Sequence, residues 1–202
     1  MRRISLFFLL LFVCGLIAPE RSHGYKILYA EQFYRLFHYN FYQYPEDLQE
    51  NIFYLEEALK ADFCNPLNAL AKIENKQEWE RYRNLFKMHV NLKLVELYLR
   101  LGSKYDKQVA YFFNEPWKEE NIKSLEKAER IYNMAFYYWD EAKRWASRIG
   151  HSYVTIEEIQ YWEDQNYRIW QGELDYSGII QSHLDRLREV KQTFEEMDED
   201  TY

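Results

Sequence analysis

The chain has 202 residues and carries 33 Asp and Glu against 26 Lys and Arg, a formal net charge of −7. No basic patch is visible along the sequence, and an acidic surface repels nucleic acid, so the composition excludes nucleic acid as a partner. Six Gly and four Pro are few for this length, which favours long helices over a turn-rich β architecture.

The N-terminal segment has the layout of a cleavable export signal. Two arginines precede an apolar run over residues 4–18, and small residues precede a cut site ahead of Tyr25. The run is shorter than the roughly 18 residues that a membrane-spanning helix needs. We therefore expect a signal peptide over residues 1–24 and an exported, periplasmic domain over residues 25–202.

Two alternatives would attach the chain to a membrane. An uncleaved N-terminal segment would anchor it, and Cys14 would carry a lipid if the chain were a lipoprotein, although the bulky Val13 before it argues against that. Membrane contact is expected only by one of these routes. After cleavage Cys64 stands alone, so no internal disulfide is expected.

Apolar spacing and helix-capping residues predict the first helices. One helix is expected over residues 25–41, and Pro45 followed by two acids begins the next. Apolar residues of that second helix form one buried stripe, made of Leu48, Ile52, Leu55 and Leu59. Asn65 and Pro66 then predict a short helix that ends near Ile73.

The helix expected over residues 76–101 has apolar residues around nearly its whole circumference, which predicts a central position. Gly102 is expected to end it as a C-terminal cap. Four polar residues follow each other at steps of four, three and four in its second half: His89, Lys93, Glu96 and Arg100. They are interpreted either as an exposed salt-bridge ladder or as the charged lining of a groove.

The longest helix is expected over residues 117–149. Its seam alternates small and large residues at steps of three and four, which lets a neighbouring helix approach closely: Leu125, Ala128, Tyr132, Ala135, Trp139, Ala142, Ala146 and Ile149. A capping box at Thr155 and Glu158 predicts the start of a further helix, which ends near Gly172. The last helix leads into an acidic tail at residues 195–202.

These elements predict an all-α single domain of about six long helices plus short ones. Short connections favour an antiparallel helix-hairpin array, either tetratricopeptide-like or an irregular helical bundle.

Sequence patterns typical of catalysis or metal binding are missing. Within residues 25–202, the motifs Glu-x-x-His, His-Glu-x-x-His, Cys-x-x-Cys and Gly-x-Ser-x-Gly and the phosphate-loop motifs do not occur. We therefore expect no metal, no cofactor and no enzymatic activity.

Aromatic residues are abundant, at 19% of the chain. Neighbouring positions on a helix diverge by about 100°, so pairs such as Tyr137 with Tyr138 and Tyr161 with Trp162 cannot all face one core. Two interpretations stay open: aromatic packing within a layered core, or an interaction surface. The candidate partner or ligand groove therefore combines these four aromatic residues with the polar strip of His89, Lys93, Glu96 and Arg100.

Two overlapping runs of Ala, aromatic residue and Ala resemble tetratricopeptide repeats. They comprise Ala128, Tyr132, Ala135, Trp139 and Ala142. No 34-residue self-similarity accompanies them, and the seam alone would produce the same pattern.

The stretch over residues 25–149 is similar to uncharacterised exported helical proteins of spirochaetes. The segments that carry the likeness are Tyr-Ala-Glu-Gln at 29–32, Asp-Phe-Cys-Asn-Pro-Leu at 62–67 and Tyr-Asp-Lys-Gln at 105–108. Some relatives in that group are scaffolds around the periplasmic flagellar motor. The resemblance implies a periplasmic adaptor and assigns no site residue.

The leading hypothesis is thus a non-enzymatic periplasmic interaction or assembly module with a protein partner. The alternative is a small-ligand-binding helical protein with an aromatic groove beside Lys93 and Arg100.

Overall fold

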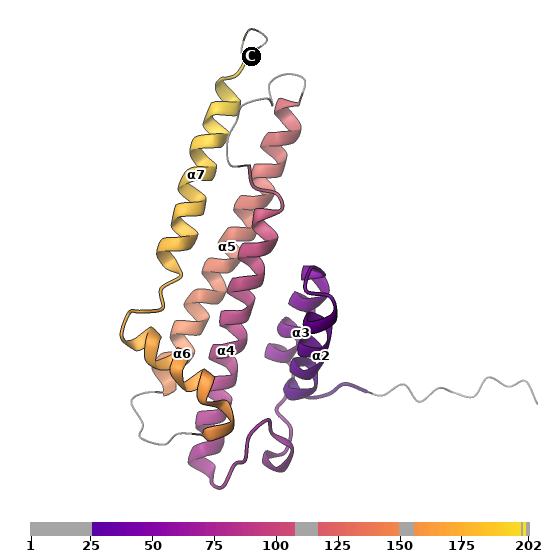
Figure 1. Cartoon of the computed structure of the whole chain (residues 1–202), viewed down its shortest axis with the longest axis vertical. Coiled ribbons are helices and arrows are strands. Elements are labelled where there is room, and N and C mark those ends of the chain that lie inside the picture. Colours follow the sequence, from indigo (N-terminus) through magenta and orange to yellow (C-terminus); the bar gives the residue numbers. More distant parts are fainter. Residues whose placement is uncertain (1–25, 108–116, 150–155, 199, 201–202) are drawn as a thin grey trace, which may run out of the picture.

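The computed structural model describes residues 26–107, 117–149, 156–198 and 200 (Figure 1). Within these ranges the chain forms six α-helices and two 3-10 helices, without a strand. The elements are α2 (Ala30–Gln43), α3 (Leu48–Lys60), η1 (Pro66–Asn68), α4 (Lys76–Ser103), α5 (Lys118–Ile149), η2 (Glu157–Ile159), α6 (Gln160–Trp170) and α7 (Ser177–Glu196). The predicted all-α class is confirmed, whereas the expected signal over residues 1–24 lies outside the described residues.

Helices α4 and α5 run side by side through the length of the molecule, with α7 against α5 (Figure 1). Every residue of the predicted α5 seam is buried, from Leu125 to Ile149. The alternation of alanine with Tyr132 and Trp139 therefore does what its spacing predicts, since the small residues let neighbouring helices approach while the rings fill the wider gaps. Helix α4 is central and buries residues around most of its circumference.

Gly102 serves close packing, which corrects the prediction that it ends the helix. It lies inside α4, which continues to Ser103. A Cβ at this position would stand 2.4 Å from Cε1 of Tyr132, closer than real Cβ atoms approach any neighbour. The glycine is therefore required because the buried Tyr132 ring of α5 lies directly on the α4 backbone.

The α2–α3 hairpin lies against α4 on the side away from α7 (Figure 1). Helix α2 begins at Ala30, later than the predicted residue 25, because the Gln32 side chain accepts the amide hydrogens of Leu28 and Tyr29 and caps the helix there. Asp47 caps α3 by accepting from the amide of Glu50. The predicted stripe on α3 is largely confirmed: Leu48, Ile52 and Leu55 are buried, and Leu59 is half-buried.

The predicted short helix after Asn65 is only the 3-10 turn η1, capped by the Asn65 side chain on the amide of Leu67. The following residues are irregular because they pack onto α4: the amide of Leu70 donates to the hydroxyl of Tyr82. In front of η1, Asp62 forms an isolated parallel bridge with Tyr29, and its carbonyl accepts from the amide of Ala30 at 2.9 Å.

Helix α6 crosses α4 near one end of the long pair (Figure 1). Of the predicted capping box, Thr155 lies outside the described residues, and the α-helix begins later, at Gln160, after the turn η2. The predicted end near Gly172 is confirmed, since this glycine has φ of 71°, in the left-handed region where a side chain is strained.

Part of the predicted acidic tail is helical. Helix α7 continues to Glu196, and the Lys118 ammonium donates to the backbone carbonyls of Glu195 and Met197 at its end. A cation fits this position because the carbonyl end of a helix carries partial negative charge.

Candidate functional site

The polar strip predicted on α4 starts in the core. His89 is 2% exposed; its Nδ1–H donates to Oε1 of Gln165 at 2.6 Å, and its Nε2 accepts from the hydroxyl of Tyr34 at 2.8 Å. Its ring stacks on Trp162 with centroids 4.9 Å apart. Burial lowers the pKa of His89 to about 3. The residue is thus a neutral link between α2, α4 and α6, and the expectation that it reaches water is wrong.

The remaining members of the strip are paired with neighbours. Lys93 forms an ion pair with Glu96 at 2.8 Å, one turn along α4. Arg100 instead donates to Oε1 of Glu46, in the connection between α2 and α3, at 2.7 Å. The ladder interpretation therefore holds for the first pair only, because the hairpin supplies the acid that neutralises Arg100.

The four predicted aromatic residues are divided between different surroundings. Tyr137 and Tyr161 are exposed, and the Tyr161 ring lies 6.0 Å from Nζ of Lys93. Tyr138 is buried and donates to Oε1 of Glu56 on α3 at 2.7 Å, while Trp162 is buried against His89 and Tyr34. The eight predicted residues therefore do not line one groove, because three of them belong to the core.

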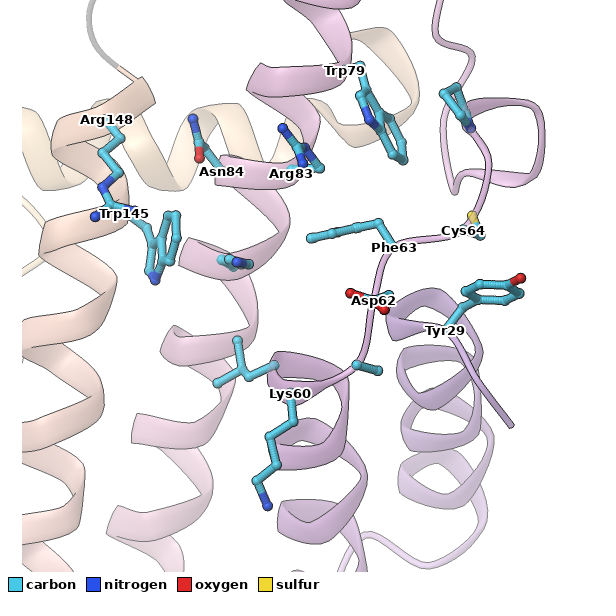
Figure 2. A pocket seen from close by; sticks show the side chains of 14 residues that line it. Tyr29, Lys60, Asp62, Phe63, Cys64, Trp79, Arg83, Asn84, Trp145 and Arg148 are labelled. Carbon is cyan, nitrogen blue, oxygen red and sulfur yellow. The ribbon is translucent and has the colours of Figure 1, made fainter. Parts of the chain in front are cut away.

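A groove of about 900 Å³ lies elsewhere, where the ends of α3 and α5 meet the first half of α4 (Figure 2). Its basic side chains are Lys60, Arg83, Lys87 and Arg148, and Asp62 is the acidic residue of its lining. We call it the basic groove. It corrects the statement that the chain has no basic patch, because residues distant in sequence assemble this one in space.

The cations of the basic groove differ in how they are neutralised. Lys60 pairs with Glu57 at 2.8 Å. Within the described ranges, Arg83, Lys87 and Arg148 form no ion pair, although acids outnumber bases in the whole chain. Burial, helped by repulsion from Arg83 and Arg148, lowers the pKa of Lys87. These three side chains form a local concentration of positive charge that an anion would relieve.

Aromatic rings separate the cations of the groove. Nζ of Lys87 lies 4.4 Å from the ring centroid of Trp145 and 5.8 Å from that of Phe63. Cζ of Arg148 lies 4.2 Å from the Trp145 centroid. Ring and cation thus alternate from Phe63 through Lys87 and Trp145 to Arg148. Such contacts stabilise each cation by about 0.5–2 kcal/mol and leave its N–H donors available to an anion.

The Cys64 thiol at the edge of the groove is poorly suited to act as a nucleophile. Its side chain is buried, and burial together with the nearby Glu31 carboxylate raises the pKa of the thiol to about 12. A protonated thiol does not attack, because the thiolate is the reactive form. Among the described residues, no group of three or more His, Cys, Asp or Glu side chains is placed to hold a metal.

One feature of the sequence points to the basic groove, although the prediction relied on the polar strip instead. Arg83 and Lys87 lie one helical turn apart on α4, so they share a face, and no acid stands three or four residues away on that face except Glu80. Glu80 instead lies 4.0 Å from Lys76. The remaining parts, Phe63 and Arg148, come from elements whose proximity only the fold shows.

The comparison with known protein families identifies α4 to α7 as a recognised unit. A family model described as a domain of unknown function, DUF8513, matches residues 77–197. The chain belongs to this family. The matched region thus supplies the groove residues of α4 and α5, including Arg83, Lys87, Trp145 and Arg148, whereas Phe63 and the lining residues before α4 precede the match.

No curated protein and no solved structure matches the chain. Across the part of the chain that the structure describes, no helix is both long and apolar enough to cross a membrane.

Proposed function

We propose that this DUF8513 protein is a non-enzymatic, exported interaction or assembly module that contacts a protein partner through the basic groove. The observation that carries the proposal is the cluster of Arg83, Lys87 and Arg148, which has no carboxylate partner within the described residues of an acidic chain. Uncompensated charge beside partly exposed rings is costly in an isolated domain and favourable once a complementary surface covers it.

The groove also agrees with the composition of protein interfaces. Arg and Trp are enriched where partners bind, because both combine a large contact area with hydrogen-bond donors. Trp79, Trp145 and Arg83 are accessible in the lining without being deeply buried. The expected export signal over residues 1–24 supports a site of action in the periplasm, where a mature domain without an internal disulfide would meet its partner.

A small-ligand-binding function is the second candidate. The groove volume of about 900 Å³ lies within the range of roughly 300–1,000 Å³ that small-molecule sites occupy. A bound metabolite would contact the same cations and rings. We place this ligand site in the basic groove and not beside Lys93 and Arg100, as the sequence predicted, because both of those side chains already have carboxylate partners.

The test is site-specific photo-crosslinking in the native host. A photoreactive phenylalanine analogue replaces Asn84, which lines the groove, and in a control strain it replaces Tyr137, an exposed ring outside it. We expect a discrete protein adduct from position 84 in the periplasmic fraction and none from position 137. Adducts at position 137 alone would contradict the proposed surface. A co-purifying small molecule without any adduct would favour the ligand-binding function.

A further inference from the structure

Two of the four groove cations are explained by the helices that carry them. Lys60 ends α3, and Arg148 lies in the last turn of α5. Cations in the last turn stabilise a helix because they face the carbonyl end of its dipole. Arg83 and Lys87, however, lie in the interior of α4, where the dipole gives no such benefit. The helix dipole therefore does not account for these two.

The groove does not have the donors of a phosphate site. Phosphate is usually held by free backbone amides at a helix N-terminus, whereas α3 and α5 bring their carbonyl ends to this groove. In the first turns of α4, the amides of Glu78 and Trp79 already donate to the side chain and to the backbone carbonyl of Asn75. Attraction for an anion thus comes mainly from the Lys and Arg side chains.

The cations are also spread along the groove. Arg83 and Lys87 follow each other by one turn of α4, and Arg148 faces them from α5. In Figure 2, Lys60 points away from Arg83 and Arg148. Several cations at separate places, with the Trp145 ring between Lys87 and Arg148 and the Trp79 ring beside Arg83, suit several anionic groups carried along one extended ligand.

We propose that the basic groove binds an acidic, extended segment of the partner protein, with carboxylates at Arg83, Lys87 and Arg148 and apolar side chains against Phe63 and Trp79. This inference rests on the proposed function and specifies the chemistry of its partner. Asp62 in the lining opposes such a segment, so its removal must strengthen binding. A merely structural role of the cations would not produce that effect.

The experiment uses the mature chain and a fluorescein-labelled peptide of alternating Glu and Leu, measured by fluorescence anisotropy. We expect saturable binding that weakens as salt rises. R83Q, which changes an exposed side chain, and K87Q are each expected to weaken it roughly tenfold, the effect of losing one charged contact. K143Q, the matched loss of a positive charge on an exposed face of α5, is expected to leave binding unchanged. D62N is expected to tighten it severalfold.

Other outcomes overturn the inference. Equal binding to K143Q and K87Q would show nonspecific attraction. Stabilisation of the folded chain by inorganic phosphate, with no peptide binding, would show a small-anion site. Salt-sensitive self-association of the chain that is lost in R83Q would show that a second copy occupies the groove. A partner adduct at position 84 without peptide binding would leave the proposed function intact and reject only the acidic-segment chemistry. Circular dichroism of each variant confirms that it is folded.

Discussion

Helix α5 joins α4 through an apolar seam of alanines and large rings, whereas the α2–α3 hairpin adds buried and partly buried hydrogen bonds where it meets the same pair of helices. Tyr34 donates to His89, and the hydroxyls of Tyr98 and Tyr138 both donate to Oε1 of Glu56 at 2.7 Å. The family match begins in the first turn of α4, so it includes the seam and leaves out the hairpin. The two regions thus differ in both chemistry and family assignment, and the basic groove lies where they meet.

This difference has an energetic consequence. Apolar burial is shared over a whole seam, whereas each polar contact depends on two particular groups. We therefore expect damage to the seam to unfold the whole domain and damage to the polar contacts to loosen the hairpin first.

Trp139→Ala is expected to have the largest effect, about 3–5 kcal/mol of lost unfolding free energy, because it leaves a cavity in the seam. It also removes the hydrogen bond from Nε1 of Trp139 to Oγ of Ser177. Urea unfolding measures the loss, and hydrogen exchange should accelerate in the core and the hairpin together. Tyr137→Ala, on the exposed face of α5, is the control and should change stability by less than about 0.5 kcal/mol. Acceleration confined to α5 would contradict a shared core.

Arg81→Met tests a polar contact inside the family-matched region. Nε of Arg81 donates to Oε1 of Glu163 at 2.8 Å, and both side chains are buried between α4 and α6. The variant leaves Glu163 buried and unpaired, so we expect a loss of about 3 kcal/mol. The double variant Arg81→Met with Glu163→Met should regain most of it. Equal loss in the single and double variants would show that the pair itself stabilises the fold.

Glu56→Ala is expected to act on the hairpin. Two tyrosine hydroxyls lose their shared acceptor, at a cost of about 1–2 kcal/mol because both groups are partly accessible to water. Hydrogen exchange should accelerate in α3 and leave α5 unchanged. Glu57→Ala is the matched control, since the Glu57 carboxylate pairs with the exposed Lys60 of the same helix. Equal acceleration along α5 would remove the distinction between the two regions.

The pH dependence of stability reports on His89. Its pKa is about 3 in the folded protein and about 6.5 when unfolded, because burial disfavours the charged ring. Unfolding therefore takes up a proton between these values, and stability falls as the pH falls from about 6.5. The slope from this residue is at most about 1.4 kcal/mol per pH unit. His89→Gln should flatten the profile between pH 6.5 and 5 relative to the native chain, as measured by urea unfolding. Parallel profiles would show that His89 is accessible to protons in the folded state.

The sequence predicted the seam because its evidence is local. Each position from Leu125 to Ile149 lies three or four residues from the next, and a repeating apolar register can bury only one face. The same spacing argument gave a wrong prediction for His89. This residue is polar and lies one helical turn from Lys93, so it was assigned to the accessible polar strip. Its partners, Tyr34 and Gln165, are 55 and 76 residues away, and no spacing rule connects them.

The basic groove was not predicted, because its residues are also distant from one another in the sequence. Its cations alternate with rings from the α3–η1 connection, α4 and α5, so their proximity depends on how three elements pack. From residue type alone, Arg83 and Lys87 are expected to lie on an ordinary solvated face of a helix. Their lack of carboxylate partners became meaningful only once every described neighbour was known.

The central claim is that the basic groove is the contact surface and that its charge makes it so. The most direct measurement is the yield of the partner adduct at position 84 in the host, compared between the otherwise native chain and one that also carries R83Q and K87Q. We predict a strong adduct in the first and a reduction of roughly tenfold or more in the second, with K143Q unchanged. An adduct of equal yield in all three chains would contradict the claim.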